Sequence, residues 1–164
     1  MLAGTKERVS RYLALLVRCE ETVGNFYRAC AGTWPGEADF WQGLADEEVD
    51  HAVRLEMVRA RIHRTPHGVG LVHAYPEGTL QTFLRSVEES TERVRAGVTT
   101  MGAALAQARD LEQSRIGSQP LRGLSFDDPR YARYQEEFSA DVLEHARRIV
   151  DRLQEALPER TVAA

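Results

Sequence analysis

Apolar residues recur every three or four positions along four long stretches of the chain, and segments rich in glycine and proline separate these stretches. This spacing places the apolar side chains of each stretch on one face of a helix. The pattern predicts helices at about residues 5–31, 37–62, 79–117 and 129–157. No segment indicates a strand. Gly97 and Gly102 lie inside the third predicted helix, where they allow a bend or close packing.

The connections between these helices differ in length. Residues 32–36 form a short link and residues 118–127 a moderate one, whereas residues 65–78 form an irregular stretch that is long for a simple turn. A long central connection suits a crossover that travels the length of a bundle, as in the ferritin-like arrangement. We therefore expect an all-α fold, a ferritin-like four-helix bundle with a long crossover between helices 2 and 3. It forms a single domain over residues 1–158, and a loose tail follows at 159–164.

The apolar face of the second predicted helix carries two polar residues at its centre. Glu48 and His51 share the spacing of Trp41, Leu44 and Leu55. A buried carboxylate without a partner is strongly unfavourable, and a bound cation removes that penalty. An inward Glu-x-x-His pair is how four-helix bundles hold di-iron or di-manganese sites. The alternative is a buried Glu–His ion pair without a metal.

The first predicted helix offers an acidic residue at a matching depth. Glu20 follows Leu16 by four positions and precedes Val23 by three, so it lies on the apolar face. Counted from the short link, Glu20 and Glu48 fall in the same layer of an antiparallel helical hairpin. We expect the two carboxylates to share a site; the alternative for Glu20 is a boundary position with its head group in solvent.

The other two predicted helices each offer one candidate ligand. His145 lies on the inward stripe of the fourth helix, and Glu88 lies at the edge of the apolar face of the third. A lone inward histidine is also found as a hydrogen-bonded core residue, and Glu88 belongs to a run of charges that fits a solvated helix face.

A known family combines such residues. Here Glu20 precedes Tyr27 by seven residues, and the pair Glu48 and His51 is followed by an alanine. In these features the chain resembles the ferritin-like di-iron carboxylate superfamily, nearest to its rubrerythrin and bacterioferritin branches, over roughly residues 5–157. The resemblance implies a ligand from each of the four helices, with Glu48 between two metals.

The resemblance also implies a glutamate from the third helix, which is Glu88, and a second Glu-x-x-His motif that ends at His145. Val142 stands where this second motif has its glutamate. Asp141 is the neighbouring position, and it reaches the metal if the helix is rotated or locally bulged.

Three alternatives follow for the function. The first is a dinuclear site that binds O2 or peroxide and uses Asp141 as the substitute ligand. The second is a single-metal site of Glu20, Glu48 and His51, with His145 nearby. The third is a bundle that has lost its metal and serves as a non-catalytic dimerisation or interaction module.

The resemblance further implies a cofactor and partners. The expected cofactor is iron, as one or two ions, with manganese or zinc as alternatives and no metal in the third case. A working site would make the protein an oxidoreductase of the peroxidase or ferroxidase type. Because no Cys-x-x-Cys pair indicates a rubredoxin-like segment, its electron donor would be a separate protein or a small molecule. The family also implies a homodimer.

Charge, hydropathy and cysteine content bear on the partners and the compartment of the protein. The formal net charge of -4 argues against a nucleic-acid-binding surface, and no apolar run is long enough for a membrane span. Cys19 and Cys30 lie too far apart on one predicted helix to bond to each other, and free buried thiols suit a reducing compartment. We therefore expect a cytoplasmic protein.

Overall fold

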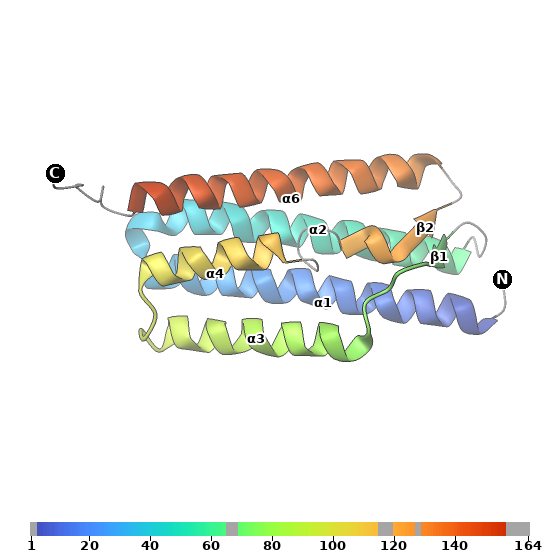
Figure 1. Ribbon diagram of the computed structural model, residues 1–164, viewed down its shortest axis with the longest axis horizontal. Coiled ribbons are helices and arrows are strands. Elements are labelled where there is room, and N and C mark those ends of the chain that lie inside the picture. The colour runs from blue at the N-terminus through green and yellow to red at the C-terminus, as the bar shows by residue number, and fades with distance from the viewer. Residues whose placement is uncertain (1–2, 65–68, 115–119, 127–128, 157–164) are drawn as a thin grey trace, which may run out of the picture.

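A computed structural model describes residues 3–64, 69–114, 120–126 and 129–156. It is mainly helical, as the sequence predicts (Figure 1). The helices are α1 (Ala3–Thr33), α2 (Ala38–Arg64), α3 (Glu77–Arg95), α4 (Met101–Gln113) and α6 (Pro129–Ala156), with short 3-10 turns η1 (Pro35–Glu37) and η2 (Pro120–Gly123) and strands β1 (Val69–Leu71) and β2 (Leu124–Phe126). The loose tail expected at 159–164 lies outside the described residues. Within the described part, no helix has both the length and the apolar character needed to cross a membrane.

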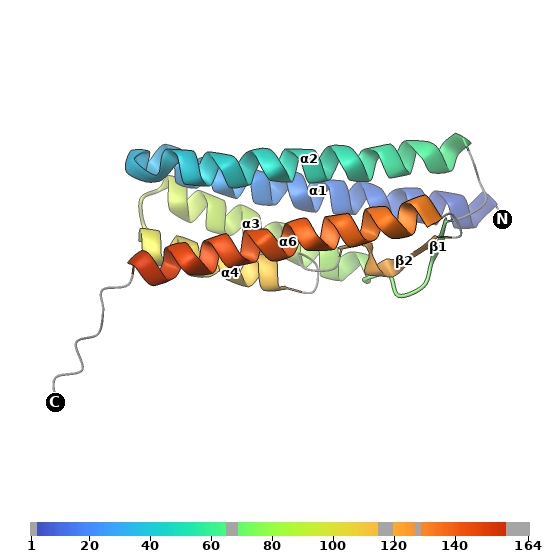
Figure 2. The same ribbon diagram turned by 90° about the horizontal axis from the view of Figure 1, so that it is seen from above.

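The helices run alternately in opposite directions along one long axis. Figure 1 shows α1, α3 and α6 running one way and α2 and α4 the other. Helix α1 packs along α2 and also against α3, while α4 packs against α6. Figure 2 shows α4 and α6 together on one side of the molecule and α1 and α2 on the other. Helix α3 also faces the interior that these helices enclose, since Leu80, Leu84, Val87 and Val94 of α3 belong to the buried core.

The third predicted helix is two helices in the structure. α3 ends at Arg95, and the chain reverses before α4 begins at Met101. Gly97 has φ +69, and its N–H donates to the carbonyl of Val94 at 2.9 Å, while the N–H of Val98 donates to that of Arg93 at 3.1 Å. These two bonds form a Schellman C-cap. The expected four-helix bundle is therefore corrected to five helices among the described residues.

The structure also corrects the expected crossover. β1 follows α2 and pairs antiparallel with β2, so that Val69 lies opposite Phe126. No strand was predicted from the sequence, because three-residue strands are too short to show an alternating pattern. Figure 1 shows both strands near the end of the molecule where α2 ends and α3 begins. The chain then travels back along the molecule as the helix α3, and not as an irregular loop.

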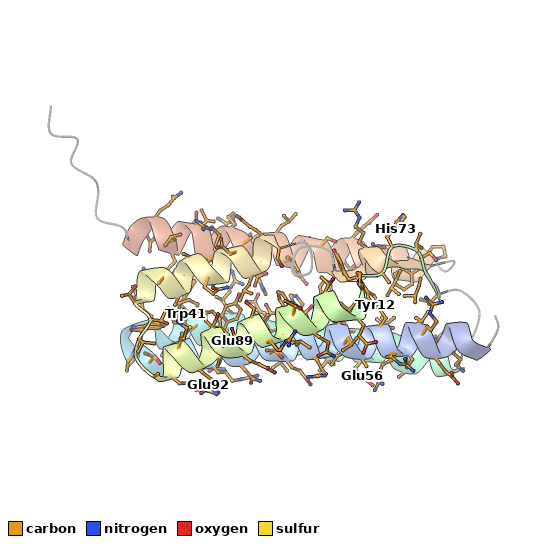
Figure 3. All side chains as sticks on the ribbon, turned by 60° about the horizontal axis from the view of Figure 1, so that its bottom comes forward. Tyr12, Trp41, Glu56, His73, Glu89 and Glu92 are labelled. Atoms are coloured by element: carbon orange, nitrogen blue, oxygen red, sulfur yellow. The ribbon has the colours of Figure 1, made fainter. Side chains whose placement is uncertain are left out.

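The apolar core is divided into two clusters along the long axis. One cluster lies near the strands and includes Leu13, Leu16, Leu55 and Phe138. The other lies near the α1–α2 turn and includes Tyr27, Trp41, Leu44, Leu105 and Ile149. Figure 3 shows Tyr12 and Trp41, one from each cluster, toward opposite ends of the molecule. The polar residues of the candidate site fall between the two clusters.

Charged contacts join α6 to the segment of chain that contains α2. Arg54 pairs with Asp141 at 2.8 Å, Arg148 pairs with Glu47 at 2.6 Å, and Arg152 Nε donates to Glu37 in η1 at 2.8 Å. The partners run in opposite order along the two segments, as expected for antiparallel helices.

Candidate metal centre

Five buried side chains of metal-ligand type meet between the two apolar clusters. Glu20 comes from α1, Glu48 and His51 from α2, Glu112 from α4 and His145 from α6; their exposed fractions are 9%, 2%, 3%, 5% and 0%. Buried acidic groups are rare unless they are paired or bind a metal. Such a concentration of acids and imidazoles in one buried layer is therefore the strongest candidate for a functional site in the described part of the chain.

Glu48 lies at the centre of this layer, between two imidazoles. Its Oε2 lies 3.4 Å from Nδ1 of His51, and its Oε1 lies 3.3 Å from Nδ1 of His145. Each carboxylate oxygen thus faces a different histidine. One ligand atom from each of these three residues lies within 4.8 Å of the others, so the group can hold a metal ion. The two imidazole rings are stacked, with centroids 5.1 Å apart.

The orientation of His145 is fixed by a contact on its other nitrogen. Nε2 contacts the carboxylate of Glu47, which also accepts a hydrogen bond from Arg148 at 2.6 Å. Partial burial alone would raise the pKa of Glu47, but the bond from Arg148 and the charge of His145 outweigh this effect and lower the pKa. An ionised carboxylate only accepts, so Nε2 carries the proton.

The other ring nitrogen of His145, Nδ1, faces Oε1 of Glu48 at 3.3 Å. Nδ1 is buried and has no hydrogen-bond partner. A histidine with one nitrogen bonded to a carboxylate and the other directed at acidic ligands is the usual arrangement at a metal. The residues present therefore fit a metal ion.

Burial and mutual repulsion control the charge of the three carboxyl groups. Burial, and then repulsion from Glu48, raises the pKa of Glu20 well above its usual range. Burial raises the pKa of Glu48 to about 7, and burial with repulsion from Glu48 raises that of Glu112 to about 8. Burial also lowers the pKa of His51, so its imidazole is neutral near pH 7. A cation would replace the protons that the carboxyl groups otherwise retain.

Tyr27 holds Glu112, the candidate ligand on α4, by a hydrogen bond. Its hydroxyl donates to Oε1 of Glu112 at 2.6 Å, and its ring packs against Trp41 with centroids 5.9 Å apart. Glu112 Oε1 is also 3.9 Å from Nδ1 of His145. The hydrogen bond therefore holds a Glu112 oxygen that lies beside the histidine.

A small cavity of about 10 Å³ opens within the layer. Its walls include Glu20, Glu48, His51, Glu112 and Val142. This volume corresponds to about one small probe sphere and is comparable to the space needed for one water. Val142 is 3% exposed and faces this cavity, at the position where the resemblance implies a glutamate.

Four of the six residues proposed from the sequence come together here: Glu20, Glu48, His51 and His145. The other two do not. Glu88 is exposed on α3, because the neighbouring Val87 takes the buried side of that helix. Asp141 pairs with Arg54, and its side chain is 44% exposed.

Glu112 is a candidate ligand that was not predicted from the sequence. It follows Ala108 by four residues and Leu105 by seven, which is the same spacing that identified Glu20. The spacing therefore indicates Glu112, but on a single helix over residues 79–117 the expected depth of the ligand pointed to Glu88.

No family model, curated protein or solved structure matches this chain.

Proposed function

We propose that the protein is a metalloprotein of the ferritin-like di-iron carboxylate type, with a partly eroded site that holds one or two iron ions. The observation that supports this most is the position of Glu48, whose two oxygens face Nδ1 of His51 and Nδ1 of His145. A carboxylate between two imidazoles is suited to bridge two metals or to clamp one. The metal, when bound, would supply redox chemistry of the peroxidase or ferroxidase type.

The five ligands divide into two groups around Glu48. Glu20 and His51 would serve one side of the site, and Glu112 and His145 the other. Three carboxylates carry a charge of -3 when ionised, and the two imidazoles are neutral ligands. One divalent ion would leave a net charge of -1 and two would leave +1. Charge balance thus permits one or two bound ions, and the Fe(II) titration counts them.

Residues around the site orient the candidate ligands and exclude water. Glu47 and Tyr27 hold two of the ligands, His145 and Glu112, through hydrogen bonds. The apolar clusters on both sides exclude bulk water, which strengthens electrostatic interactions within the layer. Val142 replaces a carboxylate by a hydrocarbon, so one wall of the cavity offers no ligand.

Metal analysis tests this proposal. The chain, purified without chelators and then titrated anaerobically with Fe(II), should bind at least one ion per chain. Glu48→Gln should abolish this binding, because it removes the central charge with little change in shape. Glu88→Gln, on the exposed side of α3, is the matched control and should bind as the parent protein does. Less than about a tenth of an ion per chain would refute the proposal, because structural and catalytic sites retain metal stoichiometrically.

The second candidate is a non-catalytic helical module that associates without a metal, most simply as a homodimer. It is favoured by Val49, Val53 and Met57, which are 40%, 53% and 67% exposed at intervals of four along α2. A row of exposed apolar side chains favours association. Sedimentation should then show a dimer that Val53→Glu dissociates, with no bound metal in either form. A monomeric parent protein would exclude the homodimeric form of this candidate.

A further inference from the structure

Glu20 separates the buried layer from the surface. Its side chain lines the small cavity of the cluster and also a surface groove of about 660 Å³ between α1 and α2. Among the residues that the structure describes, Glu20 is the one that borders both spaces, and it is the most exposed of the five candidate ligands. The groove therefore ends at a ligand of the site.

Small residues form the floor of this groove. Gly24 lies one helical turn beyond Glu20, and Ala52 lies one turn beyond Glu48. A Cβ atom placed on Gly24 would lie 3.2 Å from the Cβ of Glu48, so the two helices are closely packed here. The groove reaches inward as far as Glu20, which is the candidate ligand on its wall.

The other sides of the cluster are less open. Toward α6, Glu47 contacts His145 and Arg148, so the carboxylate and guanidinium groups fill the space outside the imidazole. Toward α3 and α4, Phe83 and Leu111 line the cavity with apolar side chains that offer a cation no ligand. A hydrated cation that approached from these directions would have to displace paired or apolar groups.

The groove itself is polar at its rim. Glu21 and Glu56 contribute carboxylates, and Arg28 and Arg59 contribute positive charge. Arg59 pairs with Glu56 at 2.7 Å, and Arg28 donates to Asn25 at 2.9 Å. Figure 3 shows Glu56 on the side of the molecule away from α6. Because acidic and basic side chains alternate here, the groove is polar but exerts no strong long-range attraction on cations.

We propose that divalent metal ions reach and leave the buried cluster through the α1–α2 groove, past the side chain of Glu20. This proposal rests on the proposed metal-binding function and adds the path to it. In this path the side chain of Glu20, which borders both spaces, turns aside to let the ion pass. Glu20 would be the first ligand that an arriving ion meets, before Glu48 and His51.

Filling the groove tests the path. Val53 lines the groove and is 53% exposed, so Val53→Trp adds bulk over the groove without entering the core. Ala52→Leu fills the floor directly. Co(II) uptake by the metal-free chain is followed by stopped-flow visible absorbance, and Co(II) release by transfer to a chelator. Leu143→Trp, at a position on α6 that is 69% exposed, is the matched control.

If Co(II) enters and leaves by the same groove, blocking the groove slows both uptake and release. We expect each groove variant to lower the uptake and release rates by a similar factor, about tenfold or more for a closely filled groove. The equilibrium dissociation constant and the number of ions bound should not change, and Leu143→Trp should leave both rates unaltered. Because Val53→Trp lies at the surface, it keeps the test valid if Ala52→Leu fails to fold.

The outcomes separate the path from the function. Unchanged rates in Val53→Trp, with normal Co(II) binding, would overturn the path and leave the metal-binding function standing. A rate decrease accompanied by an equal loss of affinity would also overturn the path, because it would show damage to the site. Absence of Co(II) binding in the parent chain would overturn the proposed function itself.

Discussion

Nδ1 of His145 lies 3.3 Å from Oε1 of Glu48, and no hydrogen bond joins the two atoms. Nδ1 of His145 is therefore a buried polar atom without a hydrogen-bond partner, which is unfavourable. A cation between the two atoms would supply the missing partner by coordination. The proposed site depends on this relationship more than on the number of acidic residues.

Glu47 should control metal affinity without being a ligand. Glu47→Ala removes the carboxylate that contacts Nε2 and orients the ring of His145, so the affinity for Co(II) or Fe(II) should fall about 10–100-fold, the usual effect of losing such a partner. Competition titration with a coloured chelator measures this change. The matched control is Asp46→Ala, which removes the neighbouring exposed carboxylate on α2 and should leave affinity unchanged. Equal losses in both variants would point to general surface charge.

Val142→Glu should restore the second Glu-x-x-His motif. In the metal-free protein the new buried carboxylate should lower the free energy of unfolding by several kcal/mol at pH 8, because no cation compensates it. With metal the number of bound ions, or their affinity, should rise. Thermal unfolding with and without Fe(II), together with metal analysis, checks both effects. Val142→Gln has a similar shape but lacks the charge, and it should show no gain in bound metal.

The metal-free protein should lose stability as the pH rises toward 8. Burial raises the pKa of Glu48 to about 7 and that of Glu112 to about 8 from a reference of 4.5. Between pH 4.5 and about 8 these two carboxyl groups hold more protons in the folded state than in the unfolded state, so the free energy of unfolding falls as the pH rises.

His51 has the opposite effect at lower pH, because burial lowers its pKa from the reference of 6.5. The effect of the carboxyl groups is therefore clearest between pH 7 and 8. Urea unfolding of chelator-treated protein across this range measures the slope, and Glu112→Gln should reduce it. A free energy of unfolding that rises with pH would contradict the assigned burial of these carboxyl groups.

The turn between α3 and α4 should depend on a single glycine. Gly97 has φ +69, so Gly97→Ala should destabilise the protein by about 1 kcal/mol. Gly102 provides the matched control, because it lies within α4 and a Cβ atom there meets nothing within 4 Å. Gly102→Ala should stabilise the protein by up to about 1 kcal/mol. Urea unfolding curves compare the two; equal effects would contradict the assigned turn.

The hydrophobic pattern could predict most helices but not the turn at residues 96–100. The apolar positions Leu80, Leu84, Val87, Thr91, Val94, Val98, Met101 and Leu105 keep steps of three or four straight through it. A five-residue turn preserved the phase of the pattern, so periodicity could not reveal the break. The local chemistry did mark it, since Gly97 suits a C-cap and Thr100 accepts a bond from the N–H of Ala103 at 3.2 Å.

The candidate site was predictable to the same extent as the helices. Glu20, Glu48, His51 and His145 lie on helices whose phase was correct, and all four are buried together. Glu112 depended on the direction in which α4 runs, which only the reversal after α3 determines. Asp141 was considered as a substitute for Val142, but the helix is neither rotated nor bulged enough to bring it inward, and Arg54 binds it at the surface.

The charged contacts between α6 and the α2 segment favour one axial register of the last helix. Each is partly exposed, and a surface ion pair contributes at most about 1 kcal/mol. A slip of α6 by one turn, about 5.4 Å, would nevertheless separate Asp141, Arg148 and Arg152 from their partners together. The same slip would carry His145 away from Glu48. These pairs therefore favour the alignment of α6 that brings His145 to Glu48, and the geometry of the buried layer depends on that alignment.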